Sequence, residues 1–128
     1  MTEQYQILVV EDEARWREDI FREALEDQGF VVQTAGDYRG AVDAFENDEF
    51  DLVIVDVNLT GVSGNQDGVR LLEYMNGLGI HAKTIVVSGS KTRSLAAESV
   101  TTFQPRAFVD KTTFDIAEFL DLVSETLD

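Results

Sequence analysis

Acidic, hydroxyl and lysine side chains follow four of the five apolar runs of this 128-residue sequence, at the point where each run ends. In chain order they are Glu11-Asp12-Glu13, Asp56, Ser88 and, after Asp110, Lys111. Carboxylates that lie close together repel one another strongly unless a proton or a cation intervenes. A hard divalent cation that prefers oxygen ligands, such as Mg²⁺, relieves this repulsion. If these residues meet in space, their types therefore point to a magnesium site with a lysine beside it.

Each of these residues also has a purely structural explanation. An acidic run at the start of a helix interacts favourably with the helix dipole, and Asp56 or Ser88 could cap a turn or a helix. Lys111 alone could be a surface charge. The combination is more specific, because ligands of an open parallel sheet bind beyond the carboxyl ends of its strands. The second run, by contrast, ends in Thr34-Ala35-Gly36-Asp37 and is expected to be an edge strand outside the site.

The five apolar runs predict the strands that must position these groups. They cover residues 7–10, 30–32, 52–55, 84–87 and 107–109. Most of them are β-branched and almost uninterrupted, which is typical of parallel strands whose two faces are both covered.

Between the runs, apolar residues recur at helical spacing. The stripes lie in residues 20–25, 38–45, 71–75, 95–103 and 116–127. Gly29 predicts the end of the first helix, Asp67 the N-cap of the third and Gly77 its end. Trp16, ahead of the first stripe, is expected to be a partly buried aromatic. Strands that alternate with helices predict an α/β sandwich with right-handed crossovers, although periodicity does not decide the order of the strands.

Composition restricts the class of protein. Residues 1–128 fit one domain with a full-sized core. The formal net charge of −15 disfavours direct binding to nucleic acid or to an anionic membrane. The sequence contains no cysteine, which excludes disulfides and thiolate metal sites. Neither a run long enough to span a membrane nor a signal-peptide pattern is present, so a cytoplasmic location is expected.

The ordered set of residues resembles the receiver domain of response regulators in two-component signalling. The resemblance rests on an acidic pair after the first strand, an Asp after the third, a hydroxyl after the fourth and a Lys after the fifth. It extends over essentially the whole chain. It implies a flavodoxin-like (βα)5 three-layer sandwich with strand order 2-1-3-4-5. It also implies a signalling switch that catalyses only its own phosphorylation and slow dephosphorylation.

The resemblance implies roles for the acidic residues. Asp56 would be the phosphoacceptor and a metal ligand. Asp12 would bind Mg²⁺ directly, Glu11 would act through a coordinated water, and the backbone carbonyl of Asn58 would complete the protein ligands. The phosphoryl group would come from a phosphohistidine on a sensor histidine kinase or a histidine phosphotransfer protein.

The resemblance also implies a conformational switch. Ser88 would donate a hydrogen bond to the phosphoryl group, and Lys111 would exchange its pairing with Asp56 for a phosphoryl oxygen. Phe108, three residues before the lysine, matches the aromatic switch position and would rotate inward when Ser88 moves. The face formed by the fourth helix, the fifth strand and the fifth helix would then change shape. Its partner would be a downstream protein, a fused output domain or a second copy in a homodimer.

Two segments depart from the family pattern. The loop after Asp56 is longer than usual, and Thr60 stands where the family commonly has a proline. Thr112, rather than proline, follows Lys111, and Phe108 lacks a hydroxyl, so a switch there would act through packing alone. None of these departures removes a phosphotransfer group.

Two other functions fit parts of the pattern. The fold could serve as a receiver-like interaction module that recognises partners without being phosphorylated, although the intact acidic, hydroxyl and lysine positions argue against this. Residues 56–60, Asp-Val-Asn-Leu-Thr, nearly match the nucleophile motif of haloacid-dehalogenase-like phosphatases. Asn58 stands where that family has its general acid and cannot donate a carboxylic proton. That motif also normally follows the first strand, so the phosphatase is the weaker alternative.

Overall fold

A computed structural model describes residues 4–56, 67–80, 82–89 and 106–128 of the chain. At its centre is a sheet of five parallel strands in the order β2-β1-β3-β4-β5. The strands are β1 (Gln6–Val10), β2 (Val31–Ala35), β3 (Leu52–Asp56), β4 (Lys83–Ser88) and β5 (Ala107–Asp110). This order confirms the predicted flavodoxin-like sheet, with β2 at an edge.

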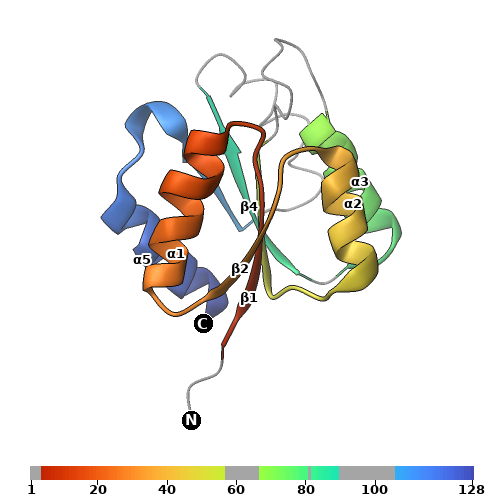
Figure 1. The fold of residues 1–128 in the computed structure, drawn as a ribbon, viewed down its shortest axis with the longest axis horizontal. Helices are drawn as coiled ribbons and strands as arrows, with labels where there is room; N and C mark the ends of the chain where they lie inside the picture. The colour runs from red at the N-terminus through yellow and green to blue at the C-terminus, as the bar shows by residue number, and fades with distance from the viewer. Residues whose placement is uncertain (1–3, 57–66, 81, 90–105) are drawn as a thin grey trace.

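Helices cover both faces of the sheet and complete a three-layer sandwich (Figure 1). On one face lie α5 (Ile116–Leu127) and the π-helical segment η1 (Arg15–Arg22), which continues into α1 (Glu23–Asp27). The helices α2 (Tyr38–Asn47) and α3 (Asp67–Gly77) lie on the other face. A 3-10 turn, η3 (Lys111–Thr113), follows β5 directly. The helix predicted in residues 95–103 lies outside the described residues.

Side chains and glycines set the ends of these helices. Asp37 and Asp115 are N-caps: their carboxylates accept hydrogen bonds from the amides of Gly40 at 2.7 Å and Glu118 at 3.0 Å. Gly29 follows α1 with a φ of 92°, a conformation that glycine adopts without steric cost. The start of α3 differs from the prediction by one residue. Asp67 was expected to be the N-cap and is instead the first residue of the helix.

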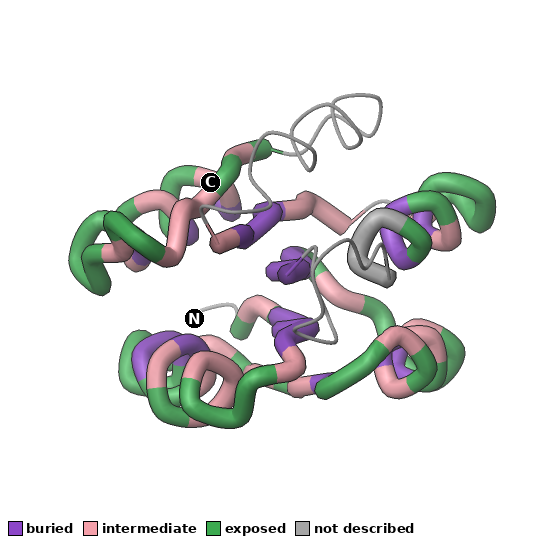
Figure 2. The backbone as a smooth tube through the Cα atoms, turned by 90° about the horizontal axis from the view of Figure 1, so that it is seen from above, coloured by how far each residue is buried: buried purple, intermediate pink, exposed green. Residues whose placement is uncertain are grey.

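The core consists of two apolar layers, one on each face of the sheet. Alternate residues of β1 enter opposite layers: Leu8 and Val10 pack on the side of α2 and α3, whereas Ile7 and Val9 pack on the side of α1 and α5. All residues of β3 are buried, and Figure 2 shows further buried segments in the central layer and in the helices on both sides of it. Burial on both faces explains why the strand sequences are uninterrupted apolar runs. Among the described helices, none has the length and hydropathy needed to cross a membrane.

Candidate functional site

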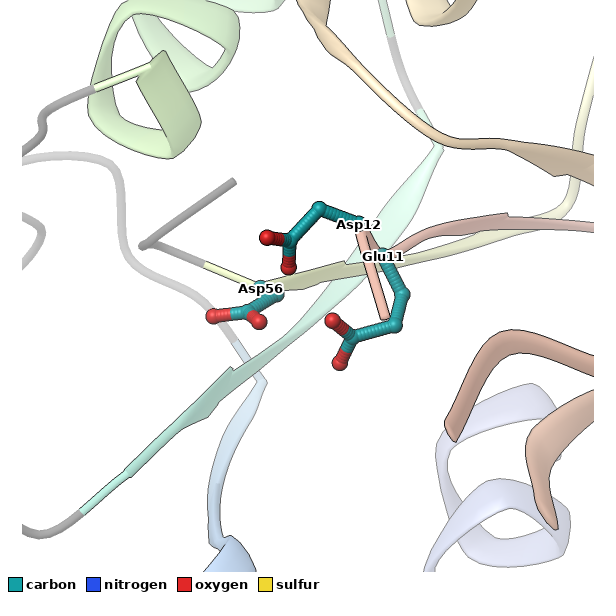
Figure 3. A group of neighbouring side chains, drawn as sticks. All are labelled: Glu11, Asp12 and Asp56. Carbon is teal, nitrogen blue, oxygen red and sulfur yellow. The ribbon is translucent and has the colours of Figure 1, made fainter. Parts of the chain in front are cut away.

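The register of the parallel strands brings three carboxylates together at the carboxyl ends of β1 and β3. Val10 of β1 pairs with Val55 of β3, so the residues that follow them, Glu11 and Asp56, come side by side. One carboxylate oxygen from each of Glu11, Asp12 and Asp56 lies within 4.8 Å of the others (Figure 3). Glu11 is 0% exposed and Asp56 is 4% exposed. The predicted neighbourhood of Asp12 and Asp56 is therefore confirmed, in a setting where water screens the charges poorly.

Lys111 provides the positive charge of this cluster. It is the first residue of η3, and the end of β5 directs its side chain back to the carboxylates. Its Nζ lies 2.6 Å from Glu11 Oε1 and 3.0 Å from Asp56 Oδ2. Glu13 is a more distant neighbour, with its Oε1 3.9 Å from the same ammonium and 58% of its side chain exposed. One ammonium thus faces several carboxylates, and the cluster keeps a net negative charge.

Burial perturbs the protonation of Glu11. Loss of solvation raises the pKa of its carboxyl to about 9, and the neighbouring charge of Asp56 acts in the same direction. Lys111 offsets only part of this rise. For Lys111, burial alone lowers the pKa, but the charges of Asp56 and Glu11 outweigh it and raise the pKa overall. In the absence of a cation, burial and the charge of Asp56 therefore favour the protonated form of Glu11.

The donor atoms of the cluster suit a hard divalent cation. Asp12 Oδ1 is buried, and among the described residues it has no hydrogen-bond partner. Glu11 Oε2 accepts a hydrogen bond from the backbone amide of Glu13 at 3.1 Å, which orients that carboxylate. Mg²⁺ is typically held by a few carboxylate oxygens and keeps several waters. The acidic triad fits that requirement, whereas the predicted fourth ligand, the carbonyl of Asn58, lies outside the described residues.

The two residues assigned to the switch lie on neighbouring strands. Ser88 is the last residue of β4, is 2% exposed and pairs with Asp110 of β5. Asp56 of β3 pairs with Val87 of β4. Ser88 is the next residue after Val87, so it lies at the same carboxyl end of the sheet as the carboxylates. Phe108 lies on the edge strand β5 and is 40% exposed, so its ring is partly in solvent.

Two residues of η1, Trp16 and Arg17, contact the site, although neither was predicted from the sequence to belong to it. Arg17 donates hydrogen bonds from Nη1 to the backbone carbonyls of Glu11 at 3.1 Å and Asp12 at 3.4 Å. The ring of Trp16 lies 5.0 Å from the Nζ of Lys111. Trp16 is partly buried, as predicted. The signal that could have pointed to both residues is their position one helical turn after the acidic run.

A known protein family matches most of the chain. The family model described as response regulator receiver domain matches residues 7–124. Among curated proteins, the transcriptional regulatory protein TcrA of Mycobacterium tuberculosis is 42% identical over 65 residues, which are 51% of this chain and 25% of TcrA. The transcriptional activator protein PfeR of Pseudomonas aeruginosa is 39% identical over 72 residues, 54% of this chain and 21% of PfeR. The match therefore spans a quarter or less of these relatives.

Solved structures are similar over nearly the whole chain. A CheY-like response regulator receiver domain protein from Methanospirillum hungatei JF-1 superimposes with a TM-score of 0.84 and 25% identity, covering 98% of this chain and 95% of that chain. The receiver domain of NtrX from Brucella abortus gives a TM-score of 0.81 and 26% identity, covering 94% of this chain and 97% of that chain. Both structures share the architecture described above.

Proposed function

Since this chain belongs to the response regulator receiver domain family, we propose that residues 1–128 form one receiver domain that acts as a phosphorylation-dependent switch. In this proposal, Asp56 accepts a phosphoryl group from a phosphohistidine. The observation that carries it is the position of Asp56: a buried carboxylate at a strand end, ion-paired with Lys111 and grouped with two further carboxylates. The partner is a sensor histidine kinase or a histidine phosphotransfer protein.

The proposed transfer is a nucleophilic substitution at phosphorus. A carboxylate oxygen of Asp56 attacks, the bond between phosphorus and the donor imidazole nitrogen breaks, and an acyl phosphate forms. The imidazole leaves with the electron pair of that bond and takes up a proton. Lys111, which contacts Asp56 at 3.0 Å, turns to an oxygen of the incoming group, and Ser88 donates a hydrogen bond to another.

Glu11, Asp12 and Asp56 are the described residues that would hold Mg²⁺. When bound, the ion supplies positive charge beside the oxygens of the transferring phosphoryl group. The contribution of the chain is to keep these carboxylates fixed and largely shielded from water. The backbone amide of Glu13 and the guanidinium of Arg17 hold Glu11 and its main chain in place for this purpose.

Phosphorylation would change the molecule because it adds a charge of about −1.5 to −2 at the end of β3. Movement of Ser88 toward that charge would open space behind it, and Phe108, now partly in solvent, would turn inward. This is a population shift between two conformations of the face that contains β5 and α5. The partner of that face would be a downstream protein, a fused output domain or a second copy of the chain. The curated relatives are transcriptional regulators several times longer than the matched segment, which supports an output through further protein parts.

Intact mass spectrometry tests the proposal. The protein is incubated with Mg²⁺ and acetyl phosphate, and the expected result is one labile phosphoryl adduct that is lost in Asp56→Asn. Asp43→Asn, on the exposed face of α2, is the matched control and should still form the adduct. Binding of Mg²⁺ without an adduct would favour a phosphorylation-independent interaction module. Rapid turnover of unrelated phosphomonoesters would favour a phosphatase instead.

A further inference from the structure

We propose that Trp16 is a positioning residue for phosphotransfer: its indole face holds the ammonium of Lys111 in place before and after Asp56 is phosphorylated. The inference rests on the proposed function and assigns a role to a residue outside the acidic triad. Trp16 would contact neither Mg²⁺ nor the phosphoryl group, so its effect would pass through Lys111.

The first observation is the surroundings of the ammonium. Lys111 Nζ lies 5.0 Å from the centroid of the Trp16 ring, within the range of a cation–π interaction. Only 11% of the lysine side chain is exposed, so water screens this attraction weakly. Tryptophan gives the strongest cation–π attraction among the aromatic side chains. The ammonium is therefore held by carboxylates and, in addition, by an uncharged aromatic face.

The second observation is that other aromatic rings hold Trp16. Its ring packs edge-on against Phe114 at 5.2 Å between centroids and lies 5.6 Å from the centroid of Phe21. Phe21 is 1% exposed, and Phe114 immediately follows η3, the turn that begins at Lys111. Trp16 thus bridges η1 and the segment that carries the lysine. Its ring does not depend on the ammonium for its position.

The uncharged ring of Trp16 is a suitable partner for Lys111, because the ammonium must change its pairing during phosphotransfer. During transfer, Lys111 must leave the Asp56 oxygen, now 3.0 Å away, for an oxygen of the phosphoryl group. Another carboxylate in the position of Trp16 would add to the repulsion within the acidic triad and would compete with the phosphoryl group for the ammonium. The indole face attracts the cation without adding negative charge. It can therefore keep Lys111 close to the site in both states.

Substitutions separate this role from simple core packing. Trp16→Leu removes the ring, and Trp16→Phe keeps a weaker one. Phe119→Leu is the matched control, because Phe119 is a buried ring of the same aromatic group that packs on Phe21 and Phe114 rather than on Trp16. The rate of phosphorylation is measured against acetyl phosphate concentration at saturating Mg²⁺, beside the Mg²⁺ affinity and the unfolding midpoint of each variant.

We expect Trp16→Leu to lower the maximal rate constant by roughly 5- to 30-fold, with Mg²⁺ affinity almost unchanged. Trp16→Phe should recover part of the rate, and Phe119→Leu should lower the unfolding midpoint while leaving the rate close to wild type. Equal rates for Trp16→Leu and Phe119→Leu, at matched stability, would reduce Trp16 to a packing residue and leave the proposed function intact. A wild-type protein that forms no adduct would overturn the proposed function and this inference together.

Fluorescence examines the contact itself. Trp16 is the single tryptophan of the chain, so the emission comes from the residue in question. Lys111→Met, which keeps most of the length of the side chain without its charge, should change the emission in the absence of any phosphodonor. An emission identical to wild type would contradict the contact. This readout does not depend on whether the protein is phosphorylated.

Discussion

Replacing Glu11 with glutamine should raise the free energy of unfolding of the protein in the absence of a cation. The increase should be larger at alkaline than at acid pH. Glutamine keeps the size of the side chain but needs no proton to be neutral. The carboxyl of Glu11 is fully buried, and desolvation raises its pKa from 4.5 to about 9. The folded wild type must therefore take up a proton that the unfolded chain has released.

The direction of the pH dependence follows from this difference in bound protons. Between pH 4.5 and about 9 the folded state holds one proton more than the unfolded state, so the free energy of unfolding falls as pH rises. The slope is about −1.4 kcal/mol per pH unit. Between pH 4.5 and 7 this slope lowers the free energy of unfolding of the wild type by about 3 kcal/mol. Glu11→Gln should regain up to that amount. Near pH 8 the gain should be about 5 kcal/mol.

In the part of the chain that the structure describes, the other groups with a shifted pKa titrate outside this window. Lys111 has a raised pKa, so its contribution to stability is fully present below its ordinary value of 10.5 and is lost only as pH rises beyond that value. The pKa of Glu18 is lowered by hydrogen bonds from Arg22 and Arg17. Its contribution is present above 4.5 and is lost as pH falls further. The difference in slope between the wild type and Glu11→Gln between pH 6 and 8 therefore reports on Glu11.

Urea unfolding at pH 6, 7 and 8 in the presence of a chelator measures the effect. Glu13→Gln is the matched control, because Glu13 is the exposed neighbour in the same acidic run and its loss should change stability little. Excess Mg²⁺ should abolish the advantage of Glu11→Gln, since only the wild type would keep the full ligand set. A difference between variant and wild type that stays constant with pH, or that favours the wild type, would refute the reasoning.

Three further results are expected. Mg²⁺ binding at pH 7 should release close to one proton, because the raised pKa of Glu11 favours its neutral form before the ion binds. The binding heat measured by calorimetry should therefore vary with the ionisation enthalpy of the buffer, and a heat that does not vary would contradict this. Gly36→Ala places a Cβ 3.0 Å from Arg17 Nη1, which should displace that group from the Glu11 carbonyl and weaken Mg²⁺ binding about threefold or more, at little cost in unfolding midpoint. Asp115→Ala removes the N-cap of α5 and should cost about 1 kcal/mol in chemical unfolding, whereas the exposed Asp121→Ala should cost much less.

The fold was predictable where burial leaves a pattern in the sequence. The residues of β3 are apolar up to Asp56 because both faces of that strand are covered, and the same holds for Ile7 to Val10 of β1. Asp115 precedes an apolar stripe and caps its helix. The order of the strands came from the family resemblance, since the pairing partners of a strand do not affect its periodicity.

The site was predictable in its residue types but only partly in its contacts. Lys111 was expected to pair with Asp56, yet its Nζ lies even closer to Glu11. Trp16 and Arg17 were not assigned to the site, because the direction of a side chain depends on the phase of its helix. η1 is π-helical, and its wider turns depart from the spacing of 3.6 residues on which the sequence interpretation relied.

The groups of the site come from distant points of the chain, and this matters for a newly made protein. The carboxylates belong to β1 and β3, whereas Lys111 follows β5 at the far edge of the sheet. Until β5 pairs with β4, Glu11, Asp12 and Asp56 lack the ammonium that offsets their repulsion. A nascent or partly unfolded chain therefore does not hold the ion-paired site. In the cell, readiness to receive a signal would then coincide with completion of the sheet, which would keep incomplete molecules out of the signalling pool.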